Sequence, residues 1–224
     1  MQTESFDLAG PAGRLEAVLM RPEAAPVAAA VVCHAHPLHG GMMHFKVVFR
    51  AAKALQHQGL AALRFNFRGV GRSEGVHDHG RGEQDDVRAA LREVEQRFPR
   101  LPLLLGGFSF GSSMALRVGA ADERVKAVFA LGFPASMAGA GGEGNLTSGT
   151  APLSLEGWRK PILFVHGERD EIGPVERIRE MVEGLPEPRR LVVIGEADHF
   201  FAGRLEALQE AVGAWAALRP WEAR

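Results

Sequence analysis

The feature that most restricts the fold of this chain is a regular alternation of short apolar runs with amphipathic stretches. The apolar runs are 27–33, 60–67, 101–105, 125–131, 162–165 and 191–194, and helical patterns lie at 45–57, 83–98, 175–183 and 205–218. The runs are almost continuously apolar, as expected of strands covered on both faces. Strand and helix in turn predict an α/β fold, with a mostly parallel sheet between two helical layers.

Two segments depart from this rhythm. Residues 4–8 and 14–20, joined by Ala9-Gly10-Pro11-Ala12-Gly13, predict an N-terminal antiparallel hairpin at the sheet edge. The segment 135–151 is rich in Gly, Ala, Ser and Thr, and we interpret it as part of a flexible, cap-like loop at about 135–158. Because the β/α pattern continues after it, we predict one domain over residues 1–224.

Composition narrows the class of protein. The 26 basic and 27 acidic residues are mixed along the chain, which gives no basic face for nucleic acid. Cys33 is the single cysteine, so no intramolecular disulfide can form. No apolar run approaches the ~18 residues of a membrane span, and the N-terminus lacks a signal-peptide pattern. We expect a cytoplasmic protein with neither nucleic acid nor membrane as a partner.

A strand–turn–helix segment near the middle of the chain carries the clearest chemical signal. An apolar run leads into Gly107-Phe108-Ser109-Phe110-Gly111, and a helix-compatible segment follows directly. In a G-x-S-x-G turn the serine stands at a strained bend, and the glycines avoid a collision between strand and helix. We predict Ser109 as a nucleophile and the amide of Phe110, at the start of the helix, as an oxyanion donor.

A serine nucleophile needs a histidine to accept its proton and a carboxylate to orient that histidine. In this topology the acid and then the histidine follow the serine, each just after a later strand. Asp170 follows the run 162–165 and His199 follows the run 191–194. We therefore predict Asp170 as the acid and His199 as the base.

Three nearby residues compete for these roles. Glu168 is the alternative acid, since it lies in the same loop as Asp170. Asp198 adjoins His199, and a sequence neighbour rarely reaches the imidazole from the required side, so we interpret it as a residue that orders the loop. His166, at a strand end, is interpreted as structural.

In this topology the loop after the strand expected at 27–33 supplies the second backbone N–H of the oxyanion hole. It reads His34-Ala35-His36-Pro37-Leu38-His39-Gly40-Gly41. Pro37 has no N–H and is removed from consideration. We favour the amide of His36, with that of Leu38 as the alternative.

Histidines are concentrated around this loop and in a later one. They are His34, His36, His39, His44, His77 and His79. Their spacing fits no familiar zinc pattern and no cysteine pair supports one, so we expect no metal and no cofactor. We expect them to line a pocket or to hold the oxyanion loop by hydrogen bonds.

A glycine-rich loop, Arg68-Gly69-Val70-Gly71-Arg72-Ser73, follows the run 60–67. A phosphate-binding loop is one interpretation, but the third glycine and the following helix start are missing. We favour a structural loop, in which Arg68 and Arg72 pair with Glu83, Asp85 or Asp86.

These segments together resemble the α/β-hydrolase superfamily over nearly the whole chain. Residues 34–37 are similar to its H-G-x-P oxyanion loop, with Ala35 in place of glycine, and residues 68–73 to its R-G-x-G-x-S loop. Residues 107–111 match the nucleophile elbow and residues 166–170 the H-G-x-x-D acid loop. The resemblance implies the α/β-hydrolase fold.

Within that superfamily the chain looks like the small, nearly capless bacterial serine hydrolases related to the dienelactone hydrolase group. Dienelactone hydrolase itself uses a cysteine nucleophile, and Ser109 argues against that specific substrate. The expected reaction is hydrolysis of a carboxylic ester with a small acyl group, or of a thioester, through an acyl-enzyme. An amidase or peptidase with the same triad, and a non-catalytic binding protein, are the alternatives. The expected partner is a small-molecule acyl substrate, and the protein is expected to be a monomer or a homodimer.

Overall fold

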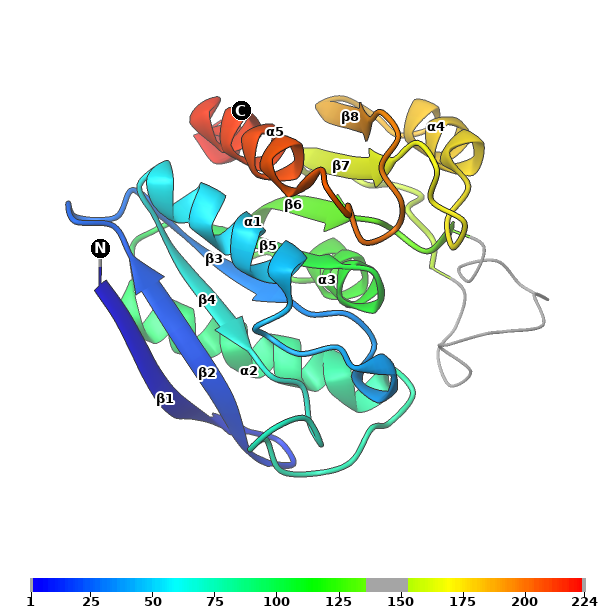
Figure 1. Cartoon of the computed structure of the whole chain (residues 1–224). Coiled ribbons are helices and arrows are strands. Elements are labelled where there is room, and N and C mark those ends of the chain that lie inside the picture. Colours follow the sequence, from blue (N-terminus) through cyan, green and yellow to red (C-terminus); the bar gives the residue numbers. More distant parts are fainter. Residues whose placement is uncertain (1, 136–152, 223–224) are drawn as a thin grey trace.

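One twisted sheet forms the centre of the computed structural model, which describes residues 2–135 and 153–222 (Figure 1). Its strands are β1 (Gln2–Gly10), β2 (Gly13–Arg21), β3 (Ala28–Cys33), β4 (Leu60–Phe65), β5 (Leu103–Phe108), β6 (Val125–Leu131), β7 (Ile162–Gly167) and β8 (Arg189–Ile194), in the order β1-β2-β4-β3-β5-β6-β7-β8. The pairs β1–β2 and β2–β4 are antiparallel and the others are parallel. The predicted α/β fold with a hairpin at the sheet edge is confirmed.

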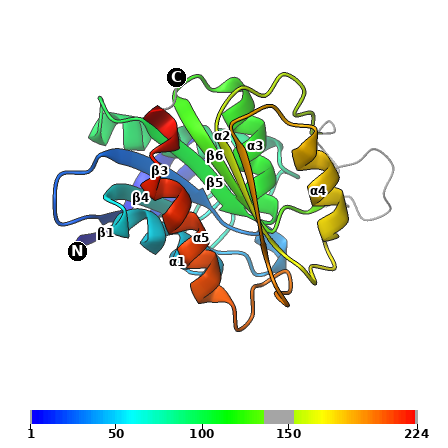
Figure 2. The same ribbon diagram turned by 90° about the horizontal axis from the view of Figure 1, so that it is seen from above.

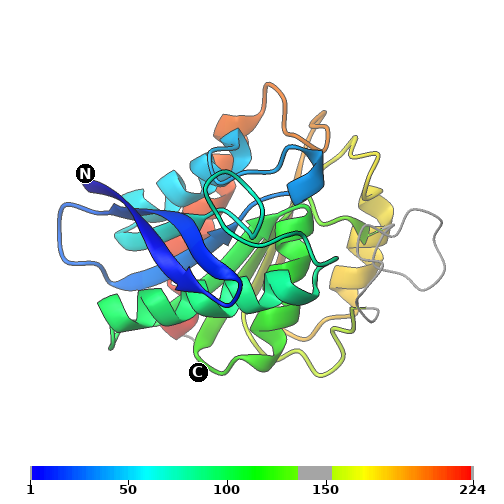
Figure 3. The ribbon, with the colours of Figure 1, turned by 90° about the horizontal axis from the view of Figure 1, so that it is seen from below.

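Helices cover both faces of the sheet. On one face lie α1 (Lys46–His57) and α5 (Leu205–Ala217), which pack against each other (Figure 2). On the other lie α2 (Arg81–Arg97), α3 (Phe110–Ala121) and α4 (Val175–Glu183) (Figure 3). Short 3₁₀ helices lie at Pro37–His39 (η1) and Pro220–Glu222 (η3).

The sheet separates two apolar clusters. Along β3, Val31 and Cys33 face the cluster under α2 and α3, whereas Ala30 and Val32 face the cluster under α1 and α5. Every residue of β3 is buried, which explains why its sequence is continuously apolar rather than alternating.

The chain reverses its direction across the sheet at β3. After β3 it passes through α1 to β4 on one side, and after β4 it crosses to β5 on the other side of β3. In open α/β sheets ligands bind beyond the carboxyl ends of strands at such a switch point. The ends of β3 and β5 approach each other closely at this point: a Cβ at Gly107 of β5 would lie 2.9 Å from Cβ of Cys33, the fully buried last residue of β3.

Some boundaries differ from those predicted. The run 60–67 ends as a strand at Phe65. Beyond it, the side chain of Asn66 bonds to the backbone of Met43 and to Glu16 of β2, and the N–H of Phe67 donates to Nε2 of His34. The run 101–105 begins as a strand only at Leu103 and continues to Phe108. Of the cap-like loop predicted at about 135–158, residues 136–152 lie outside the described residues. In the described parts of the chain, no helix is long and apolar enough to cross a membrane.

Candidate active site

Ser109 lies in a sharp turn between β5 and α3. Its φ of 53° and ψ of −118° are unusual for a residue with a side chain, and its N–H donates to the carbonyl of Leu131 at 2.9 Å. A Cβ at Gly107 would lie 2.5 Å from the backbone carbon of Gly111, and a Cβ at Gly111 would lie 2.4 Å from the carbonyl oxygen of His34. Both glycines are therefore required by the close approach of β5, α3 and the loop after β3.

The structure brings Ser109, His199 and Asp170 together. Nε2 of His199 lies 2.9 Å from Oγ of Ser109, and Nδ1 lies 2.7 Å from Oδ2 of Asp170. A carboxylate can only accept, so Nδ1–H donates to Asp170 and Nε2 is left to accept the hydroxyl proton of Ser109. All three residues are buried, each at the carboxyl end of a different strand.

Asp170 is held as a carboxylate. Its Oδ1 accepts the N–H groups of Ile172 and Gly173, both at 2.9 Å, while Oδ2 accepts from His199. Burial acts to raise the pKa of Asp170, but the hydrogen bond and charge of His199 and the Gly173 amide outweigh it and hold the pKa below its usual range. An ionised Asp170 is what the neighbouring imidazole needs to keep its orientation.

His166 supports the loop that carries Asp170. Its Nε2–H donates to the carbonyl of Gly173 and lies 3.4 Å from Oδ2 of Asp170. Burial lowers the pKa of His166, which keeps the ring neutral. This placement agrees with the structural role predicted for it.

Two other carboxylates, those of Glu168 and Asp198, have partners other than His199. Oε2 of Glu168 accepts the N–H of Glu196 at 2.8 Å, which joins the loops after β7 and β8. Oδ1 of Asp198 accepts the N–H groups of Phe200 and Ala202, at 3.0 and 2.9 Å. Asp198 thus orders the loop of His199, and Asp170 rather than Glu168 contacts the imidazole.

The two residues predicted to supply oxyanion amides lie side by side. Phe110 is the first residue of α3, so its N–H has no acceptor within the helix. The ring of His36 packs against the ring of Phe110, with centroids 5.0 Å apart. The N–H of Leu38 donates to Nδ1 of His36 at 3.2 Å, so the alternative amide already has a partner in its own loop.

The loops after β3 and β4, which carry most of the histidines, contact each other through histidine side chains. His34 connects the loops after β3 and β4: its Nδ1–H donates to the carbonyl of Ala35 and its Nε2 accepts the N–H of Phe67. Next to it the rings of His36 and His77 lie 4.8 Å apart, and Nδ1 of His77 is 2.8 Å from the buried carboxylate of Glu83. Within residues 2–135 and 153–222, no group of three or more His, Cys, Asp or Glu is arranged to hold a metal ion.

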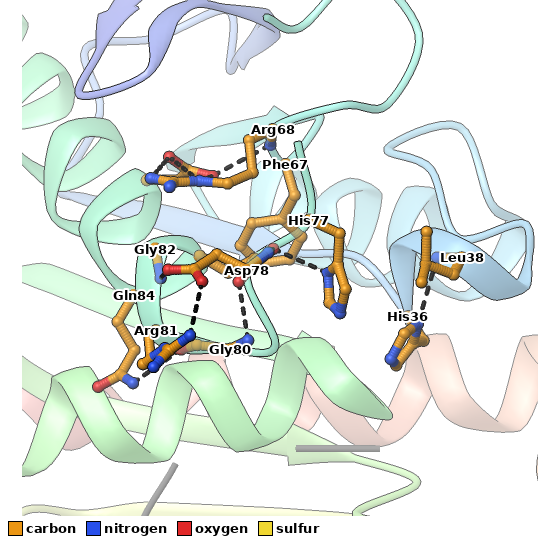
Figure 4. A network of polar contacts seen from close by, with 12 residues as sticks. His36, Leu38, Phe67, Arg68, His77, Asp78, Gly80, Arg81, Gly82 and Gln84 are labelled. Carbon is orange, nitrogen blue, oxygen red and sulfur yellow. Dashed lines mark hydrogen bonds and ion pairs between the residues drawn. The ribbon is translucent and has the colours of Figure 1, made fainter. Parts of the chain in front are cut away.

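The glycine-rich loop 68–73 is anchored by ion pairs. Arg68 binds the fully buried Asp86 through Nε and Nη2, at distances down to 2.8 Å, and through its backbone N–H (Figure 4). Asp86 is one of the partners predicted for this loop. Arg72 departs from the prediction, because it pairs with Asp7 and Glu16 on the hairpin instead.

With this geometry in view, comparison with known proteins identifies the family. The model of a family described as an alpha/beta hydrolase domain matches residues 26–217. The chain belongs to the alpha/beta hydrolase family. An uncharacterized protein of Rickettsia prowazekii is 32% identical over 209 residues, which cover 91% of this chain and 84% of the relative.

Solved structures agree with this assignment to the alpha/beta hydrolases. An alpha-beta serine hydrolase homologue from Coxiella burnetii is 38% identical, with a TM-score of 0.83 and coverage of 96% of this chain and 97% of the other. A serine hydrolase without lid from Xanthomonas campestris is 33% identical, with a TM-score of 0.83 and coverage of 100% and 97%. The suggested relationship to the dienelactone hydrolase group stays a prediction.

Two groups of residues around this alpha/beta hydrolase site were missed by sequence reasoning. Arg64 and Asn66 both bond to the backbone of Met43. Nη1 of Arg64 donates to the Met43 carbonyl at 2.6 Å, and Oδ1 of Asn66 accepts the Met43 N–H at 2.8 Å. These bonds fix the segment between the loop after β3 and α1. The sequence feature that could have indicated them is the occurrence of two polar residues near the end of the otherwise apolar run 60–67.

The second group is aromatic. Phe108 and Phe200 flank His199, with ring centroids 5.1 and 5.3 Å from the imidazole. Phe45 stacks on Phe108 and also contacts Phe200. The sequence gives no direct signal for this group, because its members come from three separate loops and strands.

Proposed function

We propose that this chain is a serine hydrolase that cleaves a carboxylic ester with a small acyl group, or a thioester, through an acyl-enzyme on Ser109. The observation that carries the proposal is the chain of contacts from Asp170 to His199 to Ser109, at 2.7 and 2.9 Å. The strained turn at Ser109 adds support, because it lifts the hydroxyl clear of the sheet.

Each group in the site has a task in this reaction. Oγ of Ser109 attacks the acyl carbon while Nε2 of His199 takes its proton, and Asp170 stabilises the imidazolium. The amides of Phe110 and His36 bind the negative oxygen of the tetrahedral intermediate. The bond between the acyl carbon and the leaving oxygen or sulfur then breaks, and His199 gives the proton to the leaving group. Water repeats the sequence on the acyl-enzyme and restores Ser109.

An ester is favoured over an amide by one comparison. The esterase domain of a Rhodothermus marinus protein is 26% identical, with a TM-score of 0.73 and coverage of 97% of this chain and 99% of that domain. Under the proposal the partner is a small acyl compound, and the protein acts in the cytoplasm as a monomer or a homodimer.

The proposal is tested by replacing the nucleophile. We expect Ser109→Ala to remain folded and to lose at least about 1,000-fold in kcat for p-nitrophenyl acetate and butyrate. Ser113→Ala, at a buried serine in the helix that follows Ser109, is the matched control and should keep its activity. A fluorophosphonate probe should label Ser109 of the unaltered protein.

Retained turnover by Ser109→Ala, or a probe adduct on another residue, would contradict the assignment. A panel of p-nitrophenyl esters, acyl thioesters and aminoacyl amides then measures which bond is preferred. Faster cleavage of the amides at equal acyl group would overturn the ester assignment while leaving Ser109 as nucleophile.

A further inference from the structure

An exposed phenylalanine stands directly beside the proposed base. Phe200 follows His199 in the chain, and its ring meets the imidazole nearly at right angles with the centroids 5.3 Å apart. Phe200 is 52% exposed, although a ring of this size gains free energy by leaving water. Its neighbour Phe201 is fully buried and packs toward Phe108. The loop therefore sends one phenylalanine into the core and leaves the other at the surface.

The position of Phe200 is fixed by its loop. Asp198 accepts the N–H of Phe200 and that of Ala202, and the buried Phe201 anchors the chain between them. Phe45, half-buried at the start of α1, contacts Phe200 with a centroid distance of 6.1 Å and stacks on Phe108 at 5.6 Å. An aromatic surface is thus held beside the imidazole before any substrate arrives.

The chemistry decides which part of a substrate meets this surface. The carbonyl oxygen of an ester must lie toward the amides of Phe110 and His36, whereas the leaving oxygen must lie toward Nε2 of His199 to receive its proton. The group attached to the leaving oxygen is therefore the part of the ester beside the imidazole and its aromatic neighbours.

We propose that Phe200 and Phe45 form a subsite for the alcohol part of the ester, and that it takes alcohols bearing an aromatic ring. This inference rests on the proposed serine hydrolase function and adds the substrate class. Both side chains are uncharged hydrocarbons, so the subsite favours flat apolar groups over charged or sugar-like ones. A ring of the substrate would stack on, or meet edge to face, the exposed ring of Phe200.

Two isomeric esters test the proposal. Benzyl acetate carries its ring on the alcohol and methyl phenylacetate carries the same ring on the acyl group, so they have the same composition. We expect kcat/KM to be higher for benzyl acetate than for methyl phenylacetate and methyl acetate. Phe200→Ala should lower kcat/KM for benzyl acetate about tenfold more than it lowers kcat/KM for methyl acetate.

Further variants separate an aromatic contact from a merely apolar one. Phe200→Leu should recover only part of the loss with benzyl acetate. Leu218→Ala, which removes an exposed apolar side chain at the end of α5, is the control and should leave kcat/KM unchanged for all three esters. An equal loss on every ester in Phe200→Ala, or a loss confined to methyl phenylacetate, would overturn the alcohol subsite.

Different results would contradict the alcohol subsite and the proposed hydrolase function. If the unaltered protein hydrolyses p-nitrophenyl acetate but Phe200→Ala keeps the same preference between the two isomers, the subsite is wrong and the hydrolase stands. If no ester is hydrolysed and Ser109 takes no fluorophosphonate label, both are wrong.

Discussion

His34 is a residue whose side chain contributes to the stability of the fold and contacts no reacting atom. Its ring is fully buried, with a donor bond to Ala35 and an acceptor bond from Phe67. Burial lowers the pKa of His34 to about 3, so the folded protein holds this ring neutral through the mildly acidic range. In the unfolded chain a histidine titrates near pH 6.5.

The depressed pKa of His34 predicts acid lability. Between about pH 6.5 and pH 3 the unfolded state binds a proton that the folded state does not, so the free energy of unfolding falls as the pH falls. We expect the unaltered protein to lose about 2 kcal/mol more than His34→Gln between pH 6.5 and 4.5. Urea unfolding at several pH values measures this, and parallel pH profiles of the two proteins would contradict it.

At the residue scale, the sequence predicts the contacts among Ser109, Asp170 and His199 better than the contacts around them. Ser109, Asp170 and His199 could be named because a local motif and a required order along the chain both constrain them. The bond from Phe67 to His34 joins residues in two loops, and only the register of β3 against β4 brings them together. No local pattern in the sequence reports that register.

Among the elements, the loop 68–73 depends most on buried charge. Arg68 and Asp86 tie it to α2, with 10% and 0% of their side chains exposed, whereas Arg72 in the same loop is 62% exposed. Removing one partner of a buried pair leaves the other charge without compensation. An exposed pair loses little, because water replaces the partner.

The two arginines should therefore differ in their effect on stability. We expect Arg68→Met to lower the free energy of unfolding by about 3 kcal/mol. Arg72→Met should lower it by no more than about 1 kcal/mol. Chemical denaturation of both variants measures the difference, and equal losses would show that the Arg68 pair is not the anchor of this loop.

Element boundaries were predictable where pattern and stop signal coincide. The run 125–131 and the helix 175–183 agree with β6 and α4 at both ends. The run 60–67 extends two residues beyond the end of β4, because the apolar Phe67 follows the single polar residue Asn66. In the structure the side chain of Asn66 bonds to Met43 and the N–H of Phe67 donates to His34. Tertiary hydrogen bonds, which a local pattern does not contain, ended that strand.

At the scale of the whole molecule, the sheet lies between two apolar clusters that can be observed separately. Trp158 belongs to the cluster beneath α2 and α3, and Trp215 and Trp221 belong to the cluster beneath α1 and α5. The chain has three tryptophans and no tyrosine, so tryptophan fluorescence reports on these positions. The sequence predicts a single domain, and we expect its two clusters to unfold together.

Single-tryptophan variants test that cooperativity. We expect one variant that keeps only Trp158, and another that keeps only Trp215, to unfold in urea with fluorescence midpoints equal to their own circular dichroism midpoints. Comparing the two signals within each variant removes any stability change caused by the substitutions. A fluorescence midpoint that departs from circular dichroism in either variant would mean that the two faces unfold as separate units.

The position of Cys33 beneath the turn of Ser109 has a practical consequence for labelling. It is the single cysteine of the chain and is fully buried, and burial raises the pKa of its thiol, so the reactive thiolate is suppressed in the folded protein. Maleimides and other sulfhydryl reagents should find no target while the fold is intact. A cysteine introduced at any surface position then becomes a unique attachment point for a fluorophore, a spin label or a solid support, without prior removal of a native thiol.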